Sequence, residues 1–323
     1  MKNLLLLTVS LLISLLALET SVRLVADTGM QFELEMWKYA RALKRPTVDP
    51  FSGHEQVPNS SARLMGVEVE INQFGHRDEL QTLEKPEGVR RILMLGDSIT
   101  FGWGVASQDT TSEILQMLLN DLYDGWHYEV VNMGIGNANT DMEVRALENN
   151  GWRFMPDVIV LNYFINDAEP TPTRAGGPLR EFSYAYVFFE GRFDVLRRRF
   201  GMALDWRKYY SDLYEPEAVG WRRSFEAIAR LAEFSRTRDI GLVIANYPEL
   251  HELAPYQFAS ITAKVAAIAD AEAVEFVDLL PAVADEDPRS LWGHPMDAHS
   301  NATANAKFAA ALLPVIQKHF NAD

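Results

Sequence analysis

Cysteine is absent from the 323-residue sequence. This absence excludes disulfide bonds, thiolate catalysis, zinc held by cysteine and a lipid anchor on a cysteine. Basic residues are also few, because 30 lysines and arginines stand against 45 aspartates and glutamates, which gives a formal net charge of -15. A nucleic-acid-binding surface needs a basic excess to neutralise phosphates, so nucleic acid is excluded as a partner.

Long apolar runs are limited to the N terminus, where residues 4–18 are rich in leucine. A run this short fits the core of a signal peptide better than a membrane span of roughly 20 residues. It is followed by no cleavage motif of small residues, and it can be extended if Glu19 and Arg23 lie at the membrane surface as a pair. We therefore interpret residues 1–26 as a signal anchor, with a cleaved signal peptide as the alternative and a buried helix as a third.

The next segment, residues 27–88, is irregular and contains several prolines and glycines. We expect it to form a stalk and a lead-in wrapped on the following domain. Within it the sequence predicts a helix at 31–43 and an edge strand or hairpin arm at 67–71, where apolar and acidic residues alternate.

Residues 89–323 alternate between short apolar runs and segments with helical periodicity. This alternation predicts parallel strands with crossover helices, and therefore an α/β domain with a doubly wound parallel sheet. The predicted strands are 92–95, 128–132, 157–163, 240–245 and 274–277, and the predicted helices are 111–122, 140–150, 217–238, 256–271 and 303–318.

An insertion at about 168–215 interrupts the alternation and is too long for a plain connection. It is rich in aromatic residues and contains the basic cluster Arg197-Arg198-Arg199. We expect an inserted cap beside the active site. Its aromatic and basic residues either form a wall that faces carbohydrate or an anion, or pack the insertion on the core with solvated arginines.

Gly96-Asp97-Ser98 directly follows the predicted strand 92–95. Ser98 therefore lies at the carboxyl end of a strand, where open α/β sheets hold their active sites. A serine nucleophile needs an adjacent base and a carboxylate that orients this base. Asp297-Ala298-His299, immediately before the last helix, offers both, whereas His294 is a rival base without a carboxylate at comparable spacing.

Acyl transfer also needs hydrogen-bond donors for the developing oxyanion. Three candidate donors follow predicted strands: the backbone N–H of Ser98, the backbone N–H of Gly134 and the side-chain amide of Asn166. Taken singly, a glycine and an asparagine at such places are typical of ordinary turns.

Together these residues form four blocks in order: Gly96-Asp97-Ser98, Asn132-Met133-Gly134, Asn166-Asp167 and Asp297-Ala298-His299. The set resembles the four sequence blocks of the GDSL/SGNH hydrolase superfamily and extends from Arg91 to the C terminus. Any one block is a weak signal, whereas four in the right order, each in a predicted strand-end loop, are a strong one.

The resemblance implies a three-layer α/β/α fold with a flavodoxin-like sheet and a serine-dependent hydrolysis of esters. It implies Ser98 as the nucleophile, His299 as the general base and Asp297 as the carboxylate that partners it. It also implies an oxyanion hole formed by Ser98, Gly134 and Asn166. No metal and no organic cofactor is expected.

Two positions depart from the superfamily pattern. The third block commonly reads Gly-x-Asn-Asp, and here Phe164 takes the position of the glycine. The last block often has two residues between the aspartate and the histidine, and here only Ala298 intervenes. The role of Asp297 is therefore less firmly implied than that of His299.

The apolar N terminus and residues 71–77 look like those of membrane-anchored bacterial members that act on acyl groups of envelope or exported polysaccharides. We therefore expect an ester hydrolase of the bacterial cell envelope, held in the inner membrane and facing the periplasm, or exported. Its substrate would be an acylated small molecule, polysaccharide or lipid. The alternatives are an O-acyltransferase that passes the acyl group to a sugar hydroxyl, and a catalytically silent glycan-binding subunit of an export complex.

Overall fold

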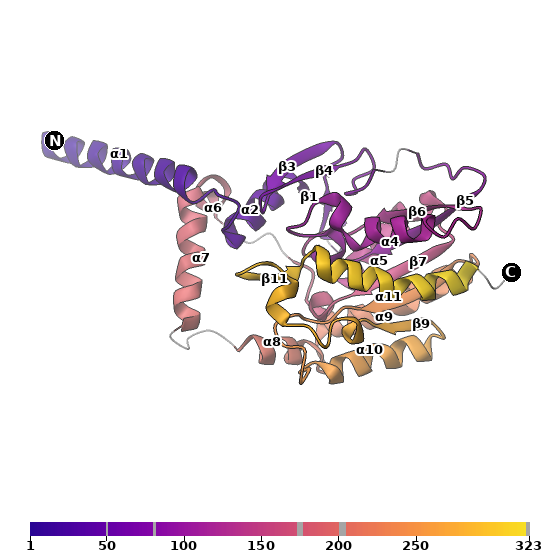
Figure 1. Cartoon of the computed structure of the whole chain (residues 1–323). Helices are drawn as coiled ribbons and strands as arrows, with labels where there is room; N and C mark the ends of the chain where they lie inside the picture. Colours follow the sequence, from indigo (N-terminus) through magenta and orange to yellow (C-terminus); the bar gives the residue numbers. More distant parts are fainter. Residues whose placement is uncertain (50, 80–81, 173–176, 200–204, 321–323) are drawn as a thin grey trace.

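The computed structural model describes residues 1–49, 51–79, 82–172, 177–199 and 205–320. Its centre is a sheet of five parallel strands in the spatial order β6-β5-β7-β8-β9 (Figure 1). The strands are β5 (Val89–Leu95), β6 (His127–Asn132), β7 (Val158–Tyr163), β8 (Gly241–Asn246) and β9 (Glu275–Asp278). Within the sheet this is the flavodoxin-like order 2-1-3-4-5, whose switch point lies between β5 and β7.

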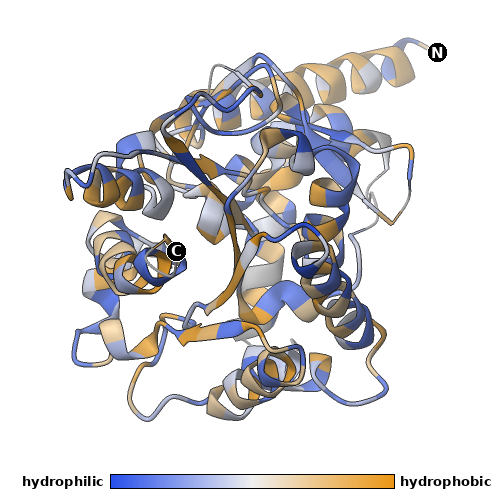
Figure 2. Ribbon diagram, turned by 90° about the vertical axis from the view of Figure 1, so that its right-hand side faces the viewer, coloured by the Kyte–Doolittle hydropathy of each residue, from blue (hydrophilic) through white to orange (hydrophobic). Residues whose placement is uncertain are grey.

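Helices cover both faces of this sheet, which confirms the predicted three-layer α/β/α fold. Successive strand residues face opposite sides, so Leu93 and Ile159 enter one apolar core whereas Ile92 and Val160 enter the other. The first core is closed by α5 (Thr140–Asn149), α9 (Val219–Arg236) and α10 (Ala259–Ala271), and the second by α4 (Thr111–Asn120) and α11 (Ala302–Phe320). Figure 2 shows apolar residues gathered along the strands, whereas the helices carry residues of both kinds.

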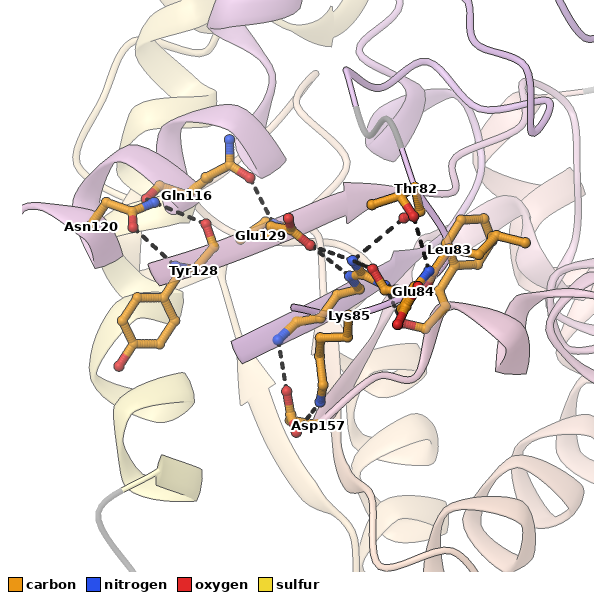
Figure 3. A network of polar contacts seen from close by, with 12 residues as sticks. Thr82, Leu83, Glu84, Lys85, Gln116, Asn120, Tyr128, Glu129 and Asp157 are labelled. Carbon is orange, nitrogen blue, oxygen red and sulfur yellow. Dashed lines mark hydrogen bonds and ion pairs between the residues drawn. The ribbon is translucent and has the colours of Figure 1, made fainter. Parts of the chain in front are cut away.

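The edge strand β6 is covered by side chains of α4 (Figure 3). The side chain of Asn120 accepts from the backbone N–H of Tyr128 and donates to its carbonyl, both at 2.9 Å. The side chain of Gln116 accepts from the N–H of Val130 at 2.8 Å. An open edge is a template for pairing with another chain, and these bonds occupy it.

Arg91 in β5 is fully buried, although arginines are mostly exposed in folded proteins. Its guanidinium binds Glu129 at 2.7 Å and donates to the carbonyls of Leu83 and Phe154 at 2.8 and 2.6 Å, in the network of Figure 3. Its backbone N–H donates to Asp157. The charge of Arg91 is thus compensated and its donors are satisfied, so a strand position can hold it. β5 begins at Val89, three residues before the predicted start of the strand.

The segment before the sheet packs on the domain through a small core of its own. It contains α2 (Phe32–Ala42) and two antiparallel hairpins, β1 (Lys44–Pro46) with β2 (His54–Gln56) and β3 (Ser60–Leu64) with β4 (Val67–Ile71). Tyr39 and Leu64 of this segment are buried against Phe101 and Trp103 of the domain. The lead-in therefore reaches the carboxyl end of β5.

The N-terminal helix α1 (Lys2–Val25) projects away from the domain (Figure 1). In the described part of the chain it is the one helix long and apolar enough to cross a membrane. Glu19 and Arg23 form the expected pair, with the two side chains 2.8 Å apart. This helix is weak evidence for a membrane anchor or a signal sequence.

The insertion contains α6 (Pro178–Phe182), α7 (Tyr184–Arg199) and α8 (Trp206–Leu213), while residues 173–176 and 200–204 lie outside the described residues. Its described helices pack at two places, α7 on α1 and α2, and α8 beside the turn that follows β7. Of its aromatic residues, Tyr184 and Trp206 pack inward, whereas Phe189 and Phe193 are exposed.

Candidate active site

Ser98 is the first residue of the short helix α3 (Ser98–Phe101), directly after β5 and beside the switch point of the sheet. The side chain of Asp97 caps this helix by accepting from the N–H of Ile99 at 2.8 Å. The turn needs glycine at position 96, because a Cβ there would lie 2.0 Å from Oγ1 of Thr100. Ser98 is thus held at the predicted position by a tightly packed turn.

His299 is brought to Ser98 by a hairpin of β10 (Trp292–His294) and β11 (Asp297–Ser300). Nε2 of His299 lies 2.8 Å from Oγ of Ser98, although 201 positions separate them in the chain. Nδ1 of His299 lies 2.5 Å from Oδ1 of Asp297. Alternate residues of a strand point to the same side, so a single residue between Asp297 and His299 suffices for this contact.

The electrostatic environment suits a base and its partner. Burial lowers the pKa of His299, but the charge and hydrogen bond of Asp297 and the charge of Asp97 outweigh it, so the pKa is raised. Burial raises the pKa of Asp297, but His299 and the donors around the carboxylate outweigh it, so the pKa is lowered. Asp297 is therefore ionised, and the imidazole can take up a proton readily.

Two aromatic residues that sequence reasoning missed hold this pair. Nε1 of Trp103 donates to Oδ2 of Asp297 at 3.1 Å. The ring of Phe32, at the start of α2, stacks on His299 with centroids 6.1 Å apart and also contacts Trp103. Trp103 follows Ser98 by five positions, but nothing in the sequence links Phe32 to a histidine near the C terminus.

The rival base His294 lies opposite Asp297 in the hairpin. Its Nδ1 accepts from the N–H of Met296 at 3.2 Å. Among the described residues it has no hydrogen bond to Ser98, so the structure brings His299 and not His294 to the serine.

Asn166 reaches the serine from the turn η3 (Ile165–Ala168) that follows β7. Its Nδ2 donates to Oδ2 of Asp97 at 2.9 Å, and the same oxygen lies 3.3 Å from Oγ of Ser98. Phe164 does not prevent this approach, because its N–H is held by Asp167 at 2.9 Å and its ring packs against both cores. The amide of Asn166 is thus placed beside Ser98, as predicted.

Gly134 is placed differently from the sequence expectation. Its N–H donates to the side-chain oxygen of Asn132 at 2.9 Å, and a Cβ at this position would lie 2.1 Å from the backbone N of Phe101. The hydrogen bond satisfies the N–H inside the protein, and the close contact explains why glycine stands here. Gly134 therefore supports α3 and does not offer a free donor to an oxyanion.

The same loop contains a donor that the sequence reasoning missed. Asn137 has a left-handed backbone with φ of 63°, and its N–H has no hydrogen-bond partner in the described ranges. The loop is held by the hydroxyl of Tyr39, which accepts from the N–H of Gly136 at 3.0 Å. Asparagine tolerates the left-handed region better than most residues, but this preference alone is too common a signal to mark a site.

Three carboxyls are buried behind the serine. Burial raises the pKa of Asp97, and it raises the pKa of Asp167 and Glu143 well above their usual values, helped by the charges of the neighbouring carboxyls. Both oxygens of Glu143 lack a hydrogen-bond partner within the described chain. In the described residues no group of three or more histidine, aspartate or glutamate side chains is arranged to hold a metal ion.

The family of the chain follows from comparison with known families. Residues 94–307 match the model of the GDSL-like Lipase/Acylhydrolase family. The match spans about two thirds of the chain and includes Ser98, Asn166 and His299. The protein therefore belongs to the GDSL-like lipase/acylhydrolase family and is a hydrolase that acts on ester bonds.

Several solved structures are similar to this chain. TesA is 17% identical, with a TM-score of 0.47 over 71% of this chain and 99% of that one. The psychrotrophic esterase EstA from Pseudoalteromonas sp. is 14% identical, with a TM-score of 0.45 over 72% and 99%. A two-domain esterase active on acetylated mannans is 13% identical, with a TM-score of 0.47 over 72% and 50%. A search among curated proteins found no match. The family assignment rests on the family model and not on these likenesses.

Proposed function

We propose that this protein hydrolyses carboxylic esters through a covalent acyl-enzyme on Ser98. The proposal is carried by one observation, the line of contacts from Oγ of Ser98 through His299 to Asp297 at 2.8 and 2.5 Å. A serine hydroxyl is a weak nucleophile until an adjacent base accepts its proton. His299 supplies that base, and Asp297 fixes its orientation and stabilises its charged form.

The reaction has two steps. Oγ of Ser98 attacks the ester carbonyl while Nε2 of His299 takes the serine proton. The carbon–oxygen bond to the alcohol then breaks, and His299 returns the proton to the leaving oxygen. In the second step water attacks the acyl-enzyme and gives a proton to His299, the acid is released, and this proton restores the hydroxyl of Ser98.

The negative charge on the carbonyl oxygen needs donors in the transition state. The N–H of Ser98 and the side-chain amide of Asn166 are supported for this role, because Asn166 lies beside the serine on Asp97. The N–H of Asn137 is the third candidate, in place of Gly134. Nδ2 of Asn166 carries two hydrogens, so one can stay on Asp97 while the other is offered to the substrate oxygen.

The proposed substrate is an acyl ester of an envelope or exported polysaccharide, or of a lipid. The proposed location is the inner membrane of a bacterial cell, with the domain facing the periplasm. Support comes from α1, which is 24 residues long, apolar and exposed except near its C-terminal end, where Val22 is buried. A helix of this length spans the hydrocarbon core of a bilayer.

The test uses the full chain in detergent with p-nitrophenyl acetate, beside Ser98→Ala as the matched variant. We expect turnover and fluorophosphonate labelling by the parent, and neither by the variant. Labelling that persists in Ser98→Ala would contradict the assignment of the nucleophile. Acyl transfer that appears only with a polysaccharide acceptor would identify the O-acyltransferase, and silence with glycan binding would identify the binding subunit.

A further inference from the structure

Helix α7 carries an exposed apolar stripe, defined by Tyr186, Phe189, Phe193 and Leu196. These residues recur at intervals of three, four and three positions, so they lie on one face of the helix. Their exposed fractions lie between 42% and 62%. A contiguous apolar surface of this kind marks a site of interaction with a protein or a membrane.

The other side of α7 is already packed. Ala185 is buried with Val22 of α1, and Val187 is buried with Leu34 and Trp37 of α2. The stripe therefore does not face the core of the molecule. Leu179 and Phe182 of α6, shortly before α7 in the chain, are exposed as well.

The start of α7 is fixed to the point where α1 becomes polar. The carboxylate of Glu19 accepts from the backbone N–H groups of Tyr184 and Ala185, both at 3.0 Å, and from the hydroxyl of Ser183 at 2.7 Å. The guanidinium of Arg23 lies 4.5 Å from the centre of the Tyr184 ring. After Lys2, these are the first charged residues of α1.

Helix α7 also runs across the direction of α1 and not along it (Figure 1). A helix that starts where a membrane-crossing helix leaves the hydrocarbon, and that runs across it, lies along the membrane surface. Interfacial helices of this kind place Phe and Leu at the acyl boundary and Lys or Arg beside them. Arg192 and Arg197 of α7 are exposed next to the stripe and can reach lipid phosphates.

We propose that the apolar stripe of α7 lies in the lipid interface at the base of α1, and that the active site works on acyl esters of membrane-bound amphiphiles. The inference rests on the membrane anchor and the esterase activity proposed above. It adds a second membrane contact, and it restricts the substrates proposed above to an ester carried by a lipid or by a glycan linked to a lipid.

A short series of contacts connects the active site to the N-terminal end of α7. His299 stacks on Phe32 of α2, and Trp37 of the same helix packs edge-on against Tyr184 of α7 at 4.8 Å. Phe32 follows Val25, the end of α1, by seven positions, and this stretch of chain can span at most about 25 Å. In Figure 1, β11 lies on the side of the domain that faces α7.

The absence of cysteine allows a direct test with single cysteines in the full chain. Phe189→Cys and Phe193→Cys carry an environment-sensitive fluorophore in vesicles of phosphatidylcholine and phosphatidylglycerol, with spin-labelled lipids as quenchers. Leu12→Cys in α1 reports on the anchor, and Lys208→Cys on α8 is the exposed control. We expect quenching by lipid at positions 12, 189 and 193, and none at 208.

The outcomes separate the two proposals. Quenching at position 12 without quenching at 189 and 193 would support α1 as a membrane anchor but contradict the proposal that α7 lies in the lipid interface. No quenching at any of these positions would overturn the anchor as well. Crosslinking of Phe193→Cys between two copies, without lipid quenching, would show that a second copy covers the stripe and would also overturn the proposal.

A kinetic experiment tests the substrate class. The double variant Phe189→Asp/Phe193→Asp should hydrolyse soluble p-nitrophenyl acetate at the parental rate, but a fluorogenic lipid ester in vesicles about tenfold more slowly, which corresponds to about 1.4 kcal/mol. Phe193→Leu should retain both activities. Equal losses on both esters, or an unchanged rate on vesicles, would contradict the proposal, whereas absent turnover by the parent would contradict the esterase activity itself.

Discussion

The indole N–H of Trp103 donates to one carboxylate oxygen of Asp297 at 3.1 Å, while His299 occupies the other. Both oxygens of the buried carboxylate therefore have a donor, and its orientation towards the imidazole is fixed. Trp103 lies beyond α3, five positions after Ser98, so the chain segment of the nucleophile also orients the carboxylate.

Trp103→Phe should lower kcat for p-nitrophenyl acetate by about tenfold with little change in KM. The reason is that a buried acceptor left without its donor costs about 1–3 kcal/mol, and the carboxylate then orients His299 less well. Trp37→Phe is the matched control, because it loses a similar indole hydrogen bond, to the carbonyl of Arg180, away from Ser98. An equal loss of kcat in both variants would contradict the positioning role of Trp103.

Asp297→Asn should shift the acid limb of the pH–rate profile to lower pH. The general base must be neutral, so parental activity rises as pH rises through the pKa of His299, which lies above 6.5. Without the carboxylate, burial dominates and the pKa of His299 falls. The rate should also fall by about 10³- to 10⁴-fold, because the imidazole loses its orientation. A limb that does not move would argue against Asp297 as the partner of His299.

Asn166→Ala should lower kcat by about 10²- to 10³-fold, the usual effect of removing one donor to an oxyanion. KM should change little, because the donor acts on the charge that develops in the transition state. The comparison is between single-turnover acylation rates of the parent and the variant. A rise in KM at unchanged kcat would show instead that Asn166 only binds the substrate.

Gly134→Ala should lower the free energy of unfolding by about 3 kcal/mol, because the new Cβ would collide with the backbone of Phe101. Asn137→Gly should keep its activity within about twofold, because glycine adopts the left-handed backbone and retains the N–H. Thermal unfolding and kcat of both variants provide the measurements. A stable Gly134→Ala enzyme with a strongly reduced kcat would restore Gly134 as a catalytic donor.

In the Glu143→Gln variant, the free energy of unfolding should fall less steeply with rising pH than it does in the parent. The pKa of Glu143 is raised well above 4.5 in the folded state, so between 4.5 and the folded value the native state binds a proton that the unfolded state has lost. Stability then falls with rising pH by about 1.4 kcal/mol per pH unit for this proton. Thermal midpoints from pH 5 to about pH 8 test this slope. The exposed Glu226→Gln is the control, and a parental slope in Glu143→Gln would contradict the prediction.

The fold could be predicted from the sequence because its strands are continuous apolar runs between turn residues. All five predicted strands of the sheet, for example 92–95 and 128–132, occur within a few residues of their expected ends. The buried Arg91 shows the limit of this reasoning: its charge is compensated by Glu129 and by carbonyls that only the folded chain brings near. No local pattern distinguishes such an arginine from a surface one.

At the candidate site, the reacting residues could be predicted from the sequence, but the residues that position them could not. Ser98, His299 and Asn166 follow strands or occur in the ordered blocks, so strand-end reasoning and the resemblance locate them. Phe32 contacts His299 across 267 positions and leaves no pattern. Gly134 was misassigned because a glycine that permits close packing and a glycine that offers a free N–H look alike in sequence.

The bonds from Glu19 to residues 183–185 give α1 a mechanical role as well. Because α1 is fastened to α7, and α7 to α2, the chain leaves the proposed membrane through a stiff joint and not through a flexible tether. If α1 tilts in the proposed membrane, the domain rotates with it. The angle at which the serine meets the bilayer is then a property of this joint, and lengthening the chain between Val25 and Phe32 would alter it far less than breaking the contacts of Glu19.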